Sequence, residues 1–174
     1  YDAFGVDAAV FTELFSAMRS NGTILDATLS MYARFDQQRI ENPDNPPPIR
    51  CNTAFARDLV KRAHREGIPI AAGTDFSTPP GVPYPALHDE LEELVRYGGL
   101  TPLEAISSAT RIGASAIGIR DTHGTLEAGR AVDFVLLESD PSADIANLRT
   151  VKAVWKNAAR YDRSAFRPGG GRKP

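Results

Sequence analysis

The sequence predicts an α/β protein in which buried strands alternate with helices. Two short apolar runs, residues 23–29 and 68–73, favour buried strands because they are rich in β-branched and apolar residues and too short for surface helices. A helical pattern with one apolar face, residues 52–66, separates them, so strand, helix and strand form a βαβ unit. Beyond Gly118, glycine turns and short β-rich runs predict antiparallel strands.

The first element is a helix that ends near residue 20, where Asn21 and Gly22 supply a left-handed stop. Its apolar residues recur at helical spacing: Val6, Val10, Phe11, Leu14, Phe15 and Met18. The strand at residues 23–29 follows. The proline-rich stretch at residues 41–50 cannot continue a helix or a central strand, so a surface loop is expected there.

Two helices are expected after the second strand. The first carries apolar residues at helical spacing and ends at Gly98 and Gly99; these residues are Leu87, Leu91, Leu94 and Val95. The second opens with the segment "TPLE", where Thr101 is the predicted N-cap and Glu104 completes a capping box. Strand-like runs at residues 131–138 and 151–156 follow, and residues 164–174 are expected to form a flexible tail.

Composition and charge exclude several classes of protein. The chain has 174 residues, 42% of them hydrophobic and 24% charged, which suits about one globular domain. Its 20 basic and 22 acidic residues are mixed along the chain, so no basic face predicts nucleic-acid binding. A single cysteine, Cys51, excludes an internal disulfide and a multi-cysteine zinc site, and a half-buried helix position is expected for it. No apolar run approaches the ~20 residues that a membrane span requires.

The chain begins at Tyr1 and within a few residues has entered a helical pattern. We therefore expect it to be part of a longer protein, whose targeting signal would lie elsewhere. The sequence does not determine the cellular compartment of the protein, although it favours the cytoplasm. A second indication points the same way, because two parallel strands that are apolar on both faces need several neighbouring strands and helices to cover them.

Asp75 stands directly after the second strand, in the segment "IPIAAGTDFSTPPG". In parallel α/β proteins the loops at the carboxyl ends of the strands build the active site. A metal ligand or general base is therefore one interpretation of Asp75. The alternative is an aspartate that stabilises a turn or caps a helix, and the local pattern alone leaves both open.

Four ordered segments extend the pattern around Asp75: "GIPIAAGTDFSTPP", "LHDELEELVRYGGLTPLEAISSATRIGASAIGI", "GTLEAGRAVDFVLLESDP" and "VKAVWKN". In order and spacing they resemble the carboxyl-terminal part of the metal-dependent amidohydrolase superfamily. Within it, the resemblance is to the branch of imidazolonepropionase-related and Xaa-Pro dipeptidase-like enzymes. It extends over roughly residues 5–160.

The resemblance implies the carboxyl-terminal portion of a (β/α)8 TIM-like barrel, with its last two strands and their helices, plus strands of a small β-sandwich. Residues 1–120 would belong to the barrel, residues 121–163 to the sandwich, and residues 164–174 to the tail. Asp75 matches the aspartate of the eighth strand, which binds a metal and takes a proton from the attacking water. The resemblance implies a divalent metal, expected to be zinc, whose other ligands would lie upstream of Tyr1.

Other polar residues near Asp75 are candidates for substrate contact: Thr74, Phe76 and Ser77 in the same loop, Thr28 near the end of the preceding strand, and His88 early in the next helix. Loop or helix packing is the alternative for each. His64 is expected near a helix end facing solvent, and His123 in a turn. No metal-ligand spacing joins the three histidines. Asp133 matches a structural aspartate of the family, and residues 157–160, "NAAR", lack the glycine the family often has there.

The resemblance implies a hydrolase of amide or cyclic amide C–N bonds that acts on a small-molecule or dipeptide substrate. As an isolated fragment the chain is expected to be inactive, because one ligand binds a metal poorly. Two alternatives remain: a non-catalytic α/β interaction module, and a deaminase-type barrel hydrolase. No nucleic-acid or membrane partner is expected, and a homo-oligomer is left open.

Overall fold

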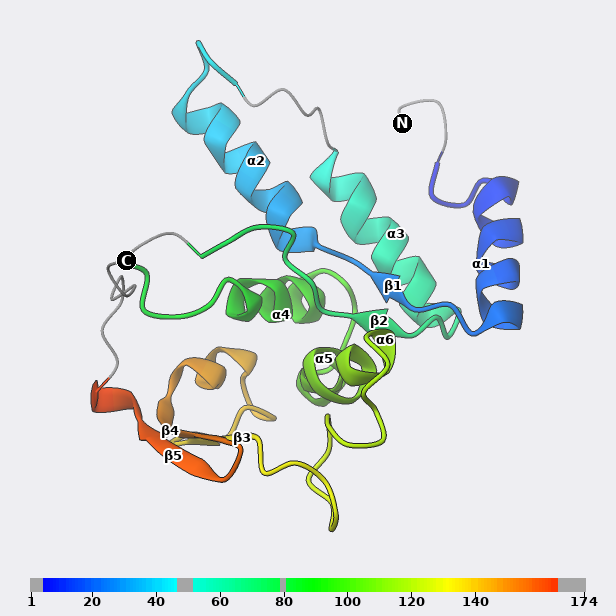
Figure 1. Ribbon diagram of the computed structural model, residues 1–174. Helices are drawn as coiled ribbons and strands as arrows, with labels where there is room; N and C mark the ends of the chain where they lie inside the picture. Colours follow the sequence, from blue (N-terminus) through cyan, green and yellow to red (C-terminus); the bar gives the residue numbers. More distant parts are fainter. Residues whose placement is uncertain (1–4, 47–51, 79–80, 166–174) are drawn as a thin grey trace, which may run out of the picture.

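The computed structural model describes residues 5–46, 52–78 and 81–165, in which helices surround two short parallel strands and an antiparallel sheet follows near the carboxyl end (Figure 1). Six α-helices are present in these residues: α1 (Ala9–Asn21), α2 (Leu29–Glu41), α3 (Thr53–Arg65), α4 (Leu87–Arg96), α5 (Pro102–Ser107) and α6 (Gly113–Ala116). A π-helical turn, Ser108–Ile112, joins α5 to α6, and short 3-10 helices lie at Ile145–Arg149 and Arg163–Ala165. The α/β class is thereby confirmed.

The strands form two sheets. β1 (Leu25–Asp26) and β2 (Ile70–Ala71) make a parallel pair, in which Leu25 lies opposite Ile70 and Asp26 opposite Ala71. Both strands are shorter than the predicted runs at residues 23–29 and 68–73. Within the described residues, each strand pairs only with the other. The hydrogen-bonded ladder between them is therefore short. The predicted strand, helix and strand unit is confirmed.

The second sheet is antiparallel, with β4 (Val151–Lys156) between β3 (Phe134–Leu137) and β5 (Ala159–Asp162). Phe134 stacks on Trp155 across the first pair, with ring centroids 4.5 Å apart. The turn between β4 and β5 uses Asn157 and Ala158, both with positive φ. Asp133 accepts a hydrogen bond from the Asn157 amide at 2.8 Å, so this aspartate braces the turn.

The helix α2 was not predicted from the sequence. The residues from Leu29 onward follow the first strand without any side-chain cap of their own. Thr28, at the N-cap position, has φ 47 and makes no capping hydrogen bond with its side chain. A threonine is a usual N-cap residue, but here its side chain does not cap the helix, so the amides of the first turn are bound from elsewhere.

The helices α3 and α5 begin as the sequence predicts. The Asn52 side chain accepts from the Phe55 amide at 3.0 Å and caps α3. Thr101 and Glu104 form the capping box of α5, in which the Glu104 carboxylate accepts from the Thr101 amide at 2.8 Å. Local sequence is sufficient where the cap lies within the helix's own first turn.

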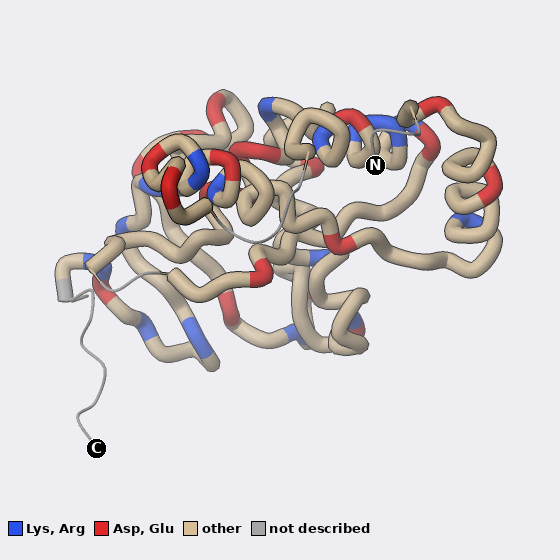
Figure 2. Tube along the Cα trace, turned by 90° about the horizontal axis from the view of Figure 1, so that it is seen from above, with Lys and Arg blue, Asp and Glu red and all other residues tan. Residues whose placement is uncertain are grey.

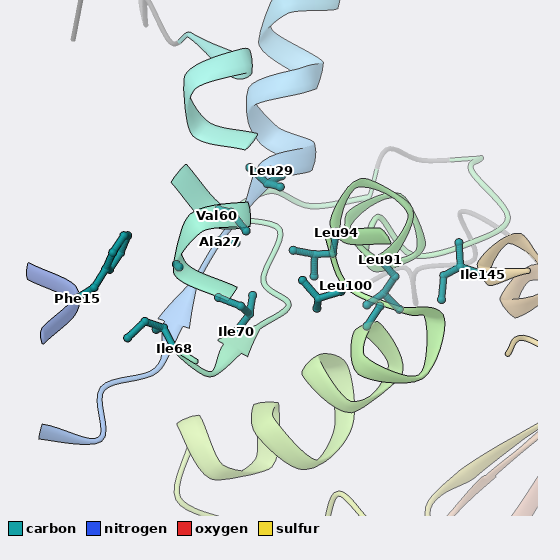
Figure 3. Packing of buried hydrophobic residues seen from close by; sticks show 12 residues of the cluster. Phe15, Ala27, Leu29, Val60, Ile68, Ile70, Leu91, Leu94, Leu100 and Ile145 are labelled. Carbon is teal, nitrogen blue, oxygen red and sulfur yellow. The ribbon is translucent and has the colours of Figure 1, made fainter. Parts of the chain in front are cut away.

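One hydrophobic core joins helices α1 to α5 to the parallel strand pair and to the 3-10 helix before β4 (Figure 3). Leu29, Ile68 and Leu94 are almost fully buried in it, and burying a side chain of this size contributes about 1.5–3 kcal/mol. Ile145, from the 3-10 helix that precedes β4, belongs to the same core. Arg149 of that helix pairs with Asp89 and Glu92 of α4. The region of the antiparallel sheet is thus fastened to α4 by apolar and ionic contacts.

Several predictions fall outside the described residues, namely the half-buried position of Cys51, the end of the proline-rich stretch (residues 47–50) and most of the tail. None of the described helices is both long and apolar enough to cross a membrane. Basic and acidic residues are interspersed over the described elements (Figure 2).

Candidate functional site

The carboxyl ends of β1 and β2 lie side by side, because the two strands are parallel and in register. Each strand end is followed by a residue other than glycine with positive φ: Thr28 (φ 47) after β1 and Asp75 (φ 53) after β2. This conformation costs roughly 1 kcal/mol or more for a residue with a Cβ, and most for a β-branched one such as Thr28. Strain at two adjacent strand ends marks this edge as the candidate site.

Asp75 is exposed at that edge. Its carboxylate makes no hydrogen bond or ion pair with any residue in the described ranges. The side chain is therefore exposed, and no arginine of the described ranges pairs with it. A free carboxylate is a hard oxygen donor that suits a divalent cation and can accept a proton from water.

Asp26 is a second carboxylate on the same side of the strand pair. It lies opposite Ala71, and side chains alternate between faces, so Asp26 shares a face with Ala71 and Gly73. Its carboxyl carbon would lie 2.6 Å from a Cβ at Gly73. Glycine at position 73 is what leaves room for this carboxylate.

Glu90 of α4 is the buried acid of the site, with no exposed surface. One carboxylate oxygen accepts from the Leu29 amide at 3.0 Å and the other from the Ser30 amide at 2.7 Å. These are the first amides of α2, so Glu90 caps a helix that begins sixty-odd positions earlier in the chain, as the sequence separations of 61 and 60 show. Burial raises the pKa of Glu90, and the hydrogen bonds from Ser30 and Leu29 oppose that rise.

Phe76 joins the loop of Asp75 to α2. The guanidinium of Arg34 lies over the Phe76 ring, 4.9 Å from its centroid, a cation–π contact. Both residues line a cavity of about 270 Å³ between α2 and α4, together with Ser30 and residues of α4. The Thr78 hydroxyl accepts from the Ala86 amide at 2.9 Å and ties the far part of the loop to the start of α4.

The remaining loop candidates differ in their surroundings. The Thr74 hydroxyl donates to the Phe76 carbonyl at 3.1 Å, and Ser77 is exposed. His88 contacts the Pro85 carbonyl through Nδ1 at 3.1 Å and packs edge-on against Tyr84. It borders a second, largely apolar cavity of about 470 Å³ between the loop and the antiparallel sheet. A role of Thr74, Ser77 or His88 toward substrate stays a prediction.

The other histidines are placed away from Asp75. His64 was expected to face solvent at the end of its helix, but its Nε2 lies 3.4 Å from the Glu104 carboxylate at the start of α5. His123 lies in a turn, beside Thr122 at 2.8 Å and Asp133 at 3.7 Å. Within the described part of the chain, no three histidine, cysteine or acidic side chains converge on a possible metal site. Asp75 has the right donor for a divalent cation, and further ligands have to come from elsewhere.

Three residues of the site were missed from the sequence, and two of them carry a visible signal. Asp26 is a charged residue inside an apolar run, which is unusual for a buried strand. Glu90 falls at helical spacing on the same face as Leu87, Leu91 and Leu94, where an acid is out of place unless it has partners. The contact between Arg34 and Phe76 depends on the fold and has no sequence signal.

The structure resembles solved structures of several hydrolases. A Xaa-Pro dipeptidase with bound methionine superposes with a TM-score of 0.73 at 27% identity, and the match covers 86% of this chain and 37% of that one. The ochratoxinase of A. niger also gives 0.73 at 27% identity, over 93% of this chain and 37% of the other.

Curated relatives include imidazolonepropionases. The protein from Klebsiella pneumoniae (strain 342) is 27% identical over 149 residues, which is 85% of this chain and 32% of the relative. That from Salmonella typhi is 37% identical over 90 residues, 51% of this chain and 22% of the relative. The chain thus spans about a fifth to a third of the length of these relatives. The model of the amidohydrolase family matches residues 10–160, most of the sequence. The chain therefore belongs to the amidohydrolase family.

Proposed function

We propose that this chain is the carboxyl-terminal part of a (β/α)8 barrel, with β1 and β2 as its last two strands, in a metal-dependent hydrolase of amide or cyclic amide C–N bonds. The observation that carries the proposal is Asp75, an exposed carboxylate after the end of a parallel strand that pairs with no other residue the structure describes. Membership of the amidohydrolase family and the likeness to a Xaa-Pro dipeptidase support the type of bond.

Asp75 has two tasks in this proposal. Its carboxylate accepts a proton from the attacking water, and the same proton passes to the leaving nitrogen as the C–N bond breaks. A divalent cation, expected to be zinc, would supply Lewis-acid activation of the water and of the substrate carbonyl. Asp75 is the described residue that would contribute to holding it. The substrate is a small molecule or a dipeptide.

The test uses the intact protein that carries this chain, loaded with zinc and assayed against Xaa-Pro dipeptides and cyclic amides. We expect Asp75→Asn to lower kcat/KM by at least about 100-fold, because the amide can neither accept the proton nor bind the cation as strongly. Asp58→Asn, at an exposed position of α3, is the matched control and should leave kcat/KM unchanged.

Other results would favour other functions. Release of ammonia from amino-substituted rings, with no cleavage of amides, would favour a deaminase. A zinc-loaded protein with no turnover of either substrate class would favour a non-catalytic interaction module and count against the proposal.

A further inference from the structure

The turn at Thr28 is held from outside its own segment. Thr28 adopts φ 47, an unfavourable conformation for a β-branched residue, and its side chain makes no capping bond. The next two amides, of Leu29 and Ser30, are both bound by the buried carboxylate of Glu90. A buried carboxyl group that accepts two backbone N–H bonds fixes the first turn of α2 and thereby opposes the strain at Thr28.

The same two helices also contact the loop of Asp75. Arg34 of α2 stacks on Phe76, the residue that follows Asp75. Glu90 itself lies on α4, the helix to which Thr78 ties that loop through the Ala86 amide. Two sets of contacts therefore connect the strand ends. Glu90 binds the start of α2, directly after Thr28, and Arg34 of α2 contacts Phe76, directly after Asp75.

We propose that Glu90 is a positioning residue for the candidate active site, which holds the strained turn at Thr28 and, through α2 and Arg34, sets the place of Phe76 and Asp75. This inference rests on the proposed function for its catalytic meaning. The structural part of the proposal, that Glu90 influences the position of Asp75, depends only on the contacts described above. Asp75 does not touch Glu90 in any described contact, so the effect has to travel through the backbone and Phe76.

The first experiment uses isotope-labelled samples of the 174-residue chain and compares Glu90→Gln with Asp58→Asn, a change of an exposed acid on α3. In Glu90→Gln the amide nitrogen faces an N–H donor, so one of the two bonds is lost. We expect faster amide exchange at Leu29 and Ser30 and shifted NMR resonances of Phe76 and Asp75. The control should move neither set. Unchanged Phe76 and Asp75 resonances in Glu90→Gln would overturn the proposal.

A second variant tests whether Glu90 stabilises the protein by holding the turn at Thr28. Thr28→Gly removes the cost of positive φ, so it should reduce the loss of stability caused by Glu90→Gln. A Glu90→Gln chain that folds only together with Thr28→Gly gives the same support. Equal destabilisation in both backgrounds would contradict the role of Glu90 at Thr28. Arg34→Gln, which removes the contact with Phe76, is expected to shift Phe76 and Asp75 while Leu29 and Ser30 keep their exchange rates.

The activity of the intact protein supplies the catalytic readout. Glu90→Gln should lower kcat by about 10-fold or more with little change in KM, because misplacing a catalytic group affects the chemical step. Loss of stability with unchanged kcat and an unchanged pH profile would overturn the catalytic role while the proposed function stands. An inactive native protein would count against the proposed function, and the NMR comparison would still decide whether Glu90 positions Asp75.

Discussion

Asp75 and Thr28 show how single residues depend on distant parts of the chain. Both were singled out from the sequence because they follow apolar strands, and the structure places both at adjacent strand ends. Their backbone strain was not foreseen, since positive φ at a threonine or aspartate follows from the surrounding contacts and not from the residue itself. The exposure of Asp75, without an ion pair to any described residue, could likewise be learned only from the fold.

Ala158 offers a direct test of strain at a single residue. It has φ 62 in the turn between β4 and β5, a position where glycine carries no steric cost. We expect Ala158→Gly to raise the free energy of unfolding by about 0.5–1 kcal/mol, measured by urea denaturation. Ala116→Gly, at the end of a helix, is the control and should lower it. A lower stability for Ala158→Gly would show that its Cβ contributes packing that outweighs the strain.

At the scale of elements, prediction succeeded where the determining residues lie close together in sequence. The capping box of α5 and the asparagine cap of α3 are both local, and both helices begin where expected. The helix α2 was missed because its N-terminal amides are satisfied by Glu90, far along the chain. The two parallel strands were recognised but predicted too long, since ladder length depends on neighbouring strands that the pattern does not show.

The capping box also makes the stability of α5 depend on pH. The Thr101 amide and hydroxyl, with a smaller contribution from His64, hold the pKa of Glu104 below its ordinary value of about 4.3. A lowered folded-state pKa means that the ionised carboxylate stabilises the fold above the unfolded-state pKa. This contribution is lost as the pH falls through the folded-state pKa.

Glu104→Gln is therefore expected to cost stability near neutral pH and progressively less as the pH falls below about 4. Urea denaturation of both chains from pH 7 to pH 3 measures the difference. Glu13→Gln, on the exposed side of α1, has no capping role and serves as the control. A cost that stays constant down to pH 3 would contradict the assigned role of the Glu104 charge.

At the scale of the whole molecule, the chain covers only part of the length of its relatives, and the residues that the structure describes bring no three possible metal ligands together. A divalent metal needs several ligands for tight binding. We expect the 174-residue chain to show no zinc binding by calorimetry at micromolar concentrations, and Asp75→Asn to leave that result unchanged. The intact protein is the positive control, and tight binding by the chain alone would show that it holds a complete site.

The contacts of Arg149 with Asp89 and Glu92 connect the carboxyl-terminal sheet to the helix that also carries Glu90. Leu91 and Ile145 lie in one core beside that connection. Recombination that exchanged the sheet for one without an arginine at this place would remove the ion pair of Asp89, while Glu92 would keep its contact with Arg96. Both acids lie on the helix whose Glu90 caps α2, so the inheritance of the sheet and the start of α2 depend on the same helix.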